Sequence, residues 1–350
     1  MKLVAVIMAG GSGKRFWPLS RESKAKQSLT LFSSKTLLGE AIERILPICS
    51  NITVVSSIKQ KEHISADVLK FDGVNVLYEP SARNTAPCIM LSIAFINSIL
   101  KEECAVLVLP SDHYIADEAK FRETILSGVE FLRKNKDAVG TIGITPTYPE
   151  TGFGYIRKGK KLENGIFSVK SFEEKPDAQK AAQFLQTGEY LWNAGIFLFS
   201  SFRMEKLFKQ VNPDIYEGVM KIDSFEKVDA DIYSSIRSIS LDYAIMEKVE
   251  KGVFTLPGDF GWSDVGNWLA YFNLLPKDEN GNASKGNVEF VDSTDSFTVN
   301  YTDKTFFLYN CSRQLVVATE DAVLCASLDD YQELKKVTDY ILSKGYTRFL

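Results

Sequence analysis

Short runs of β-branched and aliphatic residues alternate with longer segments of helical periodicity through the first half of the chain. Within one such segment, apolar residues recur at Ile89, Ile93, Ile96 and Leu100, the spacing of one buried helix face. Strands and helices that alternate in this way predict β-α-β units around a parallel sheet covered on both faces. The expected strands are Leu3–Met8, Ile52–Ser56, Val74–Tyr78 and Ala105–Leu109, and the expected helices are Thr36–Leu46 and Thr85–Leu100.

The middle third of the chain changes character, because polar insertions separate its strand-like runs. These runs cover Gly152–Ile156, Val169–Glu173 and Gly195–Phe199, with one helical segment at Ala178–Gln186. A mixed extension of the same sheet would accommodate them. The predicted fold class is therefore α/β, with a Rossmann-like, mixed but mostly parallel sheet flanked by helices.

A polar, turn-rich segment, Lys277–Asn282, is typical of a linker between domains. We therefore predict a larger domain over residues 1–276 and a smaller one over residues 277–350. Strand-like runs recur at fairly regular spacing beyond the linker and a helical segment follows them, which predicts a small β-rich domain with a terminal helix. The runs are Val288–Val291, Phe297–Asn300, Thr305–Leu308, Leu315–Ala318 and Val323–Ala326.

The formal net charge of −4 argues against non-specific binding to nucleic acid or to an anionic membrane, because such binding needs clustered Lys and Arg. Five scattered cysteines without a CxxC pair indicate neither a disulfide framework nor a zinc cluster. No apolar stretch has the length of a membrane-spanning helix, and the apolar run at the N-terminus is at the lower length limit of a signal peptide and stops at glycines. We expect a cytoplasmic protein without nucleic-acid or membrane partners.

A glycine-rich loop, Ala9-Gly10-Gly11-Ser12-Gly13-Lys14-Arg15, follows the first predicted strand directly. Glycines at such a turn let backbone amides approach phosphate oxygens closely. The Walker pattern GxxxxGK[ST] and the dinucleotide pattern GxGxxG both fail to match. Arg15 in the loop and Lys26 shortly after it supply positive charge suited to a triphosphate. Taken alone, the loop is equally compatible with a structural turn.

The fourth predicted strand ends in Pro110-Ser111-Asp112-His113. Open α/β sheets hold their ligands at the carboxyl ends of their strands, so Asp112 is a candidate metal ligand. A helix cap or a turn is the alternative role for this aspartate. His113 is left out of the candidate catalytic set, since a histidine beside a strand end is as easily a structural hydrogen-bonding group.

Several segments together resemble the signatures of the sugar-nucleotide pyrophosphorylases. The glycine-rich loop continues into Phe16–Arg21 and Lys26-Gln27, and its Trp-Pro-Leu-Ser-Arg portion is similar to the mannose-1-phosphate guanylyltransferase branch. The resemblance covers roughly the whole chain and is to the short, single-function members, which lack the isomerase domain of longer relatives. The chain departs from the family pattern at Lys14, Phe16, Ala25 and Ala82, where Thr, Leu, Pro and Gly are expected. Further matching segments are Glu79–Pro87, Gly152–Tyr155, Phe172–Pro176, Trp192–Phe197, Ser240–Lys248 and Gly261–Trp268.

The resemblance implies a role for each matching segment. Arg15 and Lys26 would stabilise the β- and γ-phosphates as pyrophosphate leaves, and Lys175 would hold the sugar phosphate. Asp112 and Asp264 would hold Mg²⁺, and Asp112 joins the two lysines and Arg15 in the catalytic set. The implied nucleotide-binding residues are Ala9, Gly10, Gly11, Ser12, Gly13, Lys14, Arg15, Glu79, Asn84, Thr85, Ser111 and Asp112. The implied sugar-phosphate-binding residues are Gly154, Tyr155, Glu173, Lys175, Asn193 and Gly195.

Simpler explanations exist for parts of this set. An ion pair would explain the Glu-Glu-Lys-Pro string that contains Glu173 and Lys175. Helix packing explains much of the block that contains Asp242 and Glu247. We expect Glu173 and Lys175 to act in binding because their segment occurs with the others in the family order, and we leave Asp242 and Glu247 out of the binding set.

The implied activity is transfer of a nucleotidyl group from GTP to mannose 1-phosphate, which gives GDP-mannose and pyrophosphate with Mg²⁺ as the cofactor. A sugar phosphate has its second pKa near ~6, so its oxygen is anionic at neutral pH and needs no general base. Another hexose-1-phosphate nucleotidyltransferase that uses UTP or dTTP is one alternative. A non-catalytic, nucleotide-sugar-binding regulatory subunit is another, and a homodimer is one possible assembly.

Overall fold

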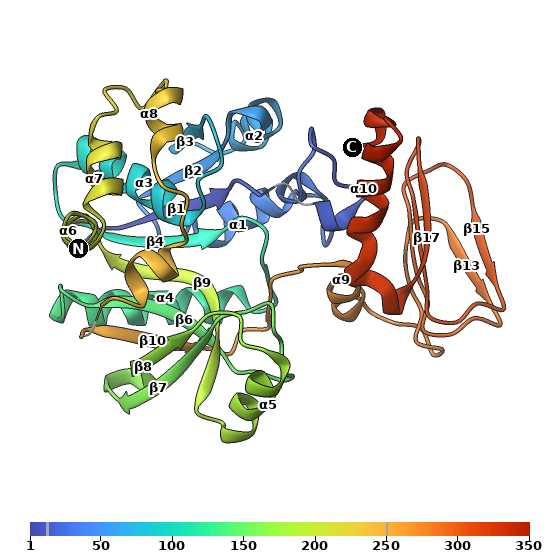
Figure 1. The fold of residues 1–350 in the computed structure, drawn as a ribbon. Coiled ribbons are helices and arrows are strands. Elements are labelled where there is room, and N and C mark those ends of the chain that lie inside the picture. The colour runs from blue at the N-terminus through green and yellow to red at the C-terminus, as the bar shows by residue number, and fades with distance from the viewer. Residues whose placement is uncertain (12–13, 250) are drawn as a thin grey trace. The chain divides into compact units, whose positions relative to one another are not determined.

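The computed structural model describes residues 1–11, 14–249 and 251–350, and it describes the backbone but not the side chains of residues 14, 331 and 332. The contacts divide the chain into two compact units (Figure 1). The first unit contains Met1–Gly10 and Leu38–Trp262. The second contains Gly11–Leu37 and Ser263–Leu350. Ser12 and Gly13, which the sequence analysis assigns to nucleotide binding, lie outside the described residues.

A nine-stranded sheet in the order β3-β2-β1-β4-β9-β6-β10-β8-β7 forms the centre of the first unit. The four strands at one end are parallel to each other, whereas β9 is antiparallel to both of its main neighbours, β4 and β6. Those four parallel strands are the ones predicted from the first half of the sequence. The strands of this unit are β1 (Leu3–Ala9), β2 (Asn51–Ser57), β3 (Val74–Glu79), β4 (Ala105–Pro110), β5 (Tyr114–Ile115), β6 (Val139–Ile144), β7 (Tyr155–Lys161), β8 (Phe167–Glu173), β9 (Tyr190–Ser200) and β10 (Val253–Gly258).

Helices cover both faces of this sheet, as the continuous apolar strands require. Alternate residues of β1 belong to two different hydrophobic clusters. Ile7 belongs to the cluster that includes buried residues of α1, α2 and α4, and Val6 belongs to the cluster that includes buried residues of α3, α6 and α7. The mixed α/β class predicted from the sequence is confirmed. The helices are α1 (Leu37–Ile45), α2 (Lys61–Val68), α3 (Thr85–Leu100), α4 (Glu118–Lys134), α5 (Ala178–Thr187), α6 (Ser201–Val211), α7 (Pro213–Met220) and α8 (Ala230–Ser235).

The second unit contains a stack of short parallel strands. Val288 pairs with Phe306 and Phe297 pairs with Leu315, and the same number of residues separates the members of each pair. Successive turns of chain therefore stack as in a solenoid, an arrangement that the prediction of a small β-rich unit did not specify. Its elements are β11 (Trp262–Ser263) at the point of division, α9 (Trp268–Leu274), β12 (Ala283–Lys285), β13 (Val288–Val291), β14 (Phe297–Asn300), β15 (Phe306–Tyr309), β16 (Gln314–Ala318), β17 (Val323–Ser327) and α10 (Lys335–Ser343).

The boundary between the units differs from the one predicted at residue 276. Trp268 of α9 packs against Phe16 with ring centroids 5.0 Å apart and against Phe297 at 6.1 Å. Its indole Nε1 donates to the Trp17 carbonyl at 3.2 Å, and the Tyr271 hydroxyl donates to the Leu31 carbonyl at 2.5 Å. This aromatic core joins residues 11–37 and α9 to the β-rich segment, so the polar linker is a surface turn inside the second unit.

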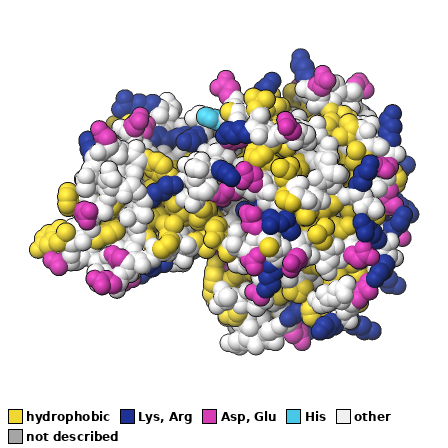
Figure 2. Space-filling view, turned by 180° about the vertical axis from the view of Figure 1, so that it is seen from behind, with side chains coloured by type: hydrophobic (Ala, Val, Ile, Leu, Met, Phe, Trp, Pro, Cys, Tyr) yellow, Lys and Arg dark blue, Asp and Glu magenta, His cyan; other side chains and the backbone are white. Residues whose placement is uncertain are grey.

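Acidic and basic side chains are interspersed on the face that Figure 2 shows, with apolar side chains scattered between them. Such mixing is typical of a protein whose charged fraction is 25% and whose net charge is small. None of the helices in the described part of the chain is both long enough and apolar enough to cross a lipid bilayer.

Candidate functional site

The ends of β1 and β4 bring together two of the predicted nucleotide-binding segments. Met8 is the register partner of Pro110, and the Ser111 amide donates to the Met8 carbonyl at 3.0 Å. The Ser56 hydroxyl donates to the Ala9 carbonyl at 2.8 Å. Ala9 and Gly10 therefore leave the sheet beside Ser111 and Asp112. This is the carboxyl edge of parallel strands, where open sheets bind ligands.

Glu79 at the end of β3 lies against the start of the glycine-rich loop. A Cβ atom added at Gly10 would lie 3.5 Å from Glu79 Oε2, so the carboxylate and this glycine are in van der Waals range. Glu79 Oε1 accepts a hydrogen bond from the Tyr233 hydroxyl. Burial raises the pKa of Glu79 to about 7, although hydrogen bonds from Tyr233 and Cys88 oppose the shift. The carboxyl group is therefore poised to change charge near neutral pH.

The loop after Glu79 fixes Asn84 and Thr85 through its backbone. Asn84 has a φ of 64° and its Oδ1 accepts from the Thr85 amide at the start of α3. Ala82, which replaces an expected glycine, is not among the described residues with positive φ. Asn84 combines its positive φ with a ψ of −172°, a backbone region that is essentially restricted to glycine, so the backbone is strained at this residue.

Arg83 is a residue of this loop that the sequence analysis did not select. Its Nε atom is buried and donates no hydrogen bond to any residue in the described part of the chain. A buried donor without a partner is uncommon in a folded protein, and an acceptor group on a bound ligand would satisfy it. The sequence signal that would have selected Arg83 is its position inside the matching segment Glu79–Pro87.

Asn193 in β9 is at the centre of the predicted sugar-phosphate side. Its amide nitrogen Nδ2 donates to Asp242 Oδ1 at 2.7 Å, and its Oδ1 accepts from the Thr141 hydroxyl at 3.0 Å. Its backbone amide donates to the Gly154 carbonyl at 2.8 Å. Gly195 has a φ of 65°, a conformation that favours glycine. The amide of Asn193 is thus held in one orientation by partners from other strands.

Glu174, rather than the predicted Glu173, is the glutamate that lies beside this asparagine. A Cβ atom at Gly154 would lie 2.5 Å from Glu174 Oε2 and 3.5 Å from the Asn193 Cβ, so a larger residue here would displace the Glu174 carboxylate. Glu173 instead pairs with Lys180 of α5. Successive side chains along an extended segment point to opposite sides, which is why neighbouring glutamates separate in this way.

Lys175 follows with a φ of 47° and pairs with Glu174 at 2.9 Å. The hydrogen bond from this ammonium to the Glu174 carboxylate raises the pKa of Lys175. Positive φ in a residue other than glycine costs free energy, and such conformations cluster at functional sites. The side chain of Lys175 is 63% exposed. The backbone strain and this exposure are typical of a residue that binds a ligand.

Asp242 begins a single π-helical turn, Asp242–Met246, of a kind often found at functional sites. Burial raises the pKa of Asp242 to about 6, and the nearby Glu174 carboxylate adds to the shift. Burial and the charges of Glu174 and Glu173 also raise the pKa of Glu247. The predicted sugar-phosphate side thus combines Asn193 and Lys175 with several carboxylates. These carboxylates repel each other when all of them are ionised.

We predict that Asp242→Asn stabilises the protein at pH 8 by about 1–3 kcal/mol and has little effect at pH 3. The folded-state pKa near 6 lies above the ordinary value of 3.8, so the ionised carboxylate destabilises the fold above pH 6. This penalty disappears as pH falls below both values, because the folded and unfolded states are then both protonated. Calorimetry at the two pH values tests this, with the exposed Asp223→Asn as control. An equal gain at both would contradict it.

The second unit carries the remaining predicted catalytic residues. Lys26 is 7% exposed, and its ammonium donates to the Asp264 carbonyl at 2.7 Å. Val265, directly after Asp264, is fully buried and has a φ of 46°, an outlier for a β-branched residue. Arg15 lies in a 3₁₀ turn, Lys14–Phe16, and its side chain is exposed. The structure therefore joins Lys26 to the Asp264 segment, far away in the chain.

Among the residues that the structure describes, no group of three or more His, Cys, Asp or Glu side chains could hold a metal ion. Asp112 belongs to the first unit and Asp264 to the second. Their pairing on one cation therefore stays a prediction. Hard carboxylate oxygens in small number are nevertheless the donors that Mg²⁺ uses when substrate phosphates complete its coordination.

His113, which is left out of the candidate catalytic set, has a structural partner. Its Nδ1 accepts from the Trp262 indole Nε1 at 3.1 Å, and the two rings pack edge to face with centroids 5.3 Å apart. The Arg44 guanidinium lies 3.5 Å from the His113 carbonyl oxygen. These contacts anchor the chain just after Asp112.

Comparison with known proteins identifies the family. Residues 4–281 match the family model described as nucleotidyl transferase. The xanthan biosynthesis protein XanB of Xanthomonas campestris is 36% identical over 98% of this chain and 74% of its own length. A mannose-1-phosphate guanylyltransferase of Salmonella muenchen is 35% identical over 97% of this chain and 73% of its own length.

A solved structure extends this likeness to three dimensions. The crystal structure of a Thermus thermophilus protein, described as a mannose-1-phosphate geranyltransferase, superposes with a TM-score of 0.88 and 32% identity. The match covers 97% of this chain and 99% of that one. The chain therefore belongs to the nucleotidyl transferase family, and within it to the group of the mannose-1-phosphate guanylyltransferases.

Proposed function

We propose that this protein transfers a guanylyl group from GTP to mannose 1-phosphate, which releases pyrophosphate and forms GDP-mannose. The observation that carries the proposal is the 35% identity to a mannose-1-phosphate guanylyltransferase over 97% of the chain. The first unit supports it, because the ends of β1 and β4 gather the nucleotide segments and β9 presents the oriented amide of Asn193.

The proposed reaction is an in-line displacement at the α-phosphorus of GTP. An anionic oxygen of mannose 1-phosphate forms the new P–O bond, and the bond between the α-phosphorus and the α,β-bridging oxygen breaks. The electron pair of the broken bond leaves with pyrophosphate. Because the attacking oxygen is already anionic, no general base is needed. Lys175 orients the attacking phosphate, while Arg15 and Lys26 stabilise the charge on the leaving group. Asn193 and Glu174 supply hydrogen-bonding groups for the sugar hydroxyls.

Asp112 and Asp264 are the residues that we propose to hold Mg²⁺. Their carboxylates fit the donor preference of this ion. A bound divalent cation would neutralise negative charge on the phosphate oxygens.

Glu79 is proposed to select guanine. The Watson–Crick edge of guanine offers two donors, N1–H and the N2 amino group, which an ionised carboxylate accepts together. Uracil and thymine place carbonyl acceptors on both sides of N3–H, so the same carboxylate would repel them. The position of Glu79 beside Gly10 and its bond from Tyr233 support this role.

We predict that Glu79→Gln raises the KM for GTP about tenfold at pH 8, because hydrogen bonds to a charged acceptor are worth about 1.5–3 kcal/mol. In the wild type, the KM for GTP should also rise as pH falls through about 7, where Glu79 becomes protonated. Steady-state kinetics of both proteins from pH 6 to pH 9 test this. Titration of the substrates affects both proteins equally, so parallel profiles would refute the role of Glu79.

The proposed function is tested by pyrophosphate release from a panel of nucleotides and sugar phosphates. GTP with mannose 1-phosphate should give the highest kcat/KM. A preference for UTP or dTTP would reassign the chain to another hexose-1-phosphate nucleotidyltransferase. Tight binding of GDP-mannose without any pyrophosphate release would indicate a regulatory subunit instead.

A further inference from the structure

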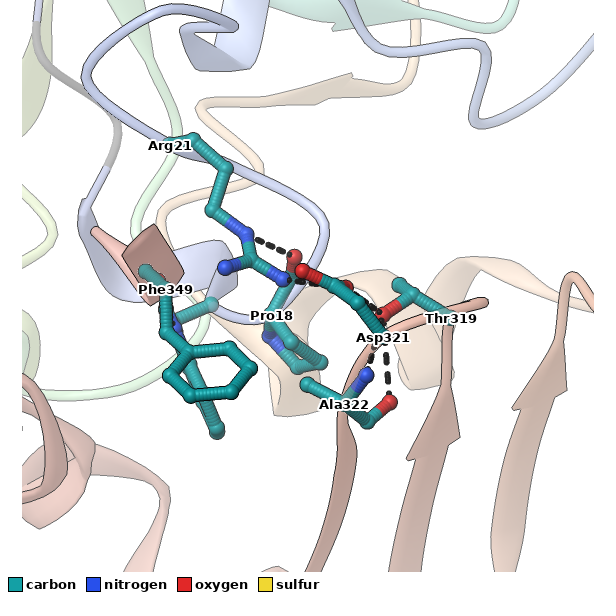
Figure 3. Close-up of polar contacts among 7 residues, drawn as sticks. Pro18, Arg21, Thr319, Asp321, Ala322 and Phe349 are labelled. Atoms are coloured by element: carbon teal, nitrogen blue, oxygen red, sulfur yellow. Dashed lines mark hydrogen bonds and ion pairs between the residues drawn. The ribbon is translucent and has the colours of Figure 1, made fainter. Parts of the chain in front are cut away.

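The segment Trp17–Arg21, which follows the glycine-rich loop, contains an arginine that the proposed mechanism does not use. Its Nε donates to the Pro18 carbonyl at 2.8 Å, so the side chain folds back on its own segment. One terminal nitrogen donates to Asp321 Oδ1 at 2.8 Å (Figure 3). The Arg21 guanidinium also lies 5.8 Å from the centre of the Trp17 ring, within cation–π range.

The turn that receives Arg21 is ordered by its own hydrogen bonds. The Thr319 hydroxyl donates to Asp321 Oδ1 at 2.9 Å, the same oxygen that accepts from Arg21. The Thr319 amide donates to the Ala322 carbonyl at 2.9 Å, which closes the turn between β16 and β17. The Ala322 amide in turn donates to the Thr319 hydroxyl at 3.2 Å (Figure 3). These hydrogen bonds orient the Asp321 side chain independently of Arg21.

The C-terminal residues form a second anchor for the same segment. The Trp17 indole Nε1 donates to the Phe349 carbonyl at 2.8 Å. Trp17 and Arg21 also line a cavity of about 60 Å³ together with Thr338 and Leu342 of α10. The side chain of Arg21 is 13% exposed, against 53% for Asp321, so water screens this ion pair less than it screens most surface pairs.

Short hydrogen-bonded turns connect Arg21 to the predicted phosphate-binding residues on either side. The Leu19 and Ser20 amides donate to the Phe16 carbonyl at 2.8 Å and 3.0 Å, directly after Arg15. Arg21 and Lys24 exchange backbone hydrogen bonds at 2.9 Å and 3.1 Å, just before Lys26. A displacement of Arg21 would therefore be transmitted in both directions along the loop.

We propose that Arg21 is a positioning residue, which fixes Arg15 and Lys26 by anchoring their loop to the Thr319–Ala322 turn and to the C-terminal residues. The β-rich segment thereby influences the binding of the triphosphate and of the leaving pyrophosphate. The inference rests on the proposed function for the roles of Arg15 and Lys26. Arg21 itself uses its guanidinium within the second unit and needs no contact with substrate.

The test compares two Arg–Asp pairs of the second unit. Asp321→Ala removes the partner of Arg21. Asp329→Ala removes the partner of Arg313, an exposed pair within the β-rich segment with N–O distances of 2.9 Å and 3.1 Å. The side chains of Asp321 and Asp329 are similarly exposed, at 53% and 59%. Only the first pair reaches the loop.

Asp321→Ala should raise the KM for GTP, and for pyrophosphate in the reverse reaction, about three- to fivefold, the upper range for an exposed ion pair. The KM for mannose 1-phosphate should not change, and Asp329→Ala should change none of the three. Arg21→Gln should resemble Asp321→Ala, and the double variant should be no worse than either, because both substitutions break one interaction.

Hydrogen exchange supplies a readout that does not depend on activity. The amides of Leu19, Ser20 and Lys24 should exchange several times faster in Asp321→Ala than in Asp329→Ala, while those of α3 stay unchanged. Equal exchange in the two variants, or a common rise in all three KM values together with a lower Tm, would overturn the positioning role. A wild-type enzyme that releases no pyrophosphate would instead refute the proposed function, and the exchange comparison would still decide whether Arg21 anchors the loop.

Discussion

Asp112→Asn is expected to lower kcat by about 10²–10³-fold, the usual loss when one group that stabilises transition-state charge is removed. The substitution removes a negative charge at nearly constant volume, so binding of Mg²⁺ should weaken while the fold is kept. The main chain at this position is already fixed by Ser111 and His113, whose backbone groups bond to Met8 and Arg44. Its Tm should therefore stay close to that of the wild type.

The measurement for Asp112 is the dependence of pyrophosphate release on Mg²⁺ concentration. The variant should need a higher Mg²⁺ concentration for half-maximal activity. Asp117→Asn is a suitable control, because Asp117 caps α4 through the Lys120 amide at 2.9 Å and asparagine caps helices equally well. Wild-type activity and Mg²⁺ dependence in Asp112→Asn would remove this residue from the site.

Lys26→Met is expected to lower kcat to a similar extent, about 10²–10³-fold, in both reaction directions. Methionine keeps an apolar side chain packed near Phe16, whose ring centre lies 5.8 Å from the Lys26 ammonium, but it removes the positive charge. It also deprives the Asp264 carbonyl of its bond from Lys26 at 2.7 Å. We therefore expect a stability loss of about 2 kcal/mol, typical of hydrogen bonds to charged groups.

Kinetics well below the Tm separate the two effects of Lys26→Met, with Lys24→Met as the control. Lys24 lies in the same loop, but its side chain is exposed. The control should retain wild-type kcat and Tm. A Lys26→Met enzyme that loses stability and keeps its kcat would show that Lys26 is purely structural.

The first four strands, α1 and α3 could be predicted because continuous apolar runs and helical spacing are local properties of the sequence, whereas α2 was not predicted. The run at Ala105–Leu109, for example, becomes β4, Ala105–Pro110. The position of Asp112 at the sheet edge followed from the same local pattern. Five of the short strands beyond the linker were located to within one residue, and β12 was missed. Their stacking depends on which strands become neighbours, and short runs do not encode this.

The membership of residues 11–37 in the second unit could not be predicted, because it depends on contacts such as Phe16 with Trp268, which are far apart in the chain. The sequence also did not indicate which of Glu173 and Glu174 lies beside Gly154. Both glutamates fit the string Glu-Glu-Lys-Pro, and only the local backbone direction decides which of them faces Gly154.

Transfer of an isotope label tests the central claim most directly. Mannose 1-phosphate carrying ¹⁸O in its non-bridging phosphate oxygens is incubated with GTP, Mg²⁺ and the purified protein, and the products are analysed by mass spectrometry. Attack of the sugar phosphate on the α-phosphorus predicts GDP-mannose that retains all of the label and pyrophosphate that contains none. Label in pyrophosphate, or GTP consumption without GDP-mannose, would contradict the proposed guanylyl transfer.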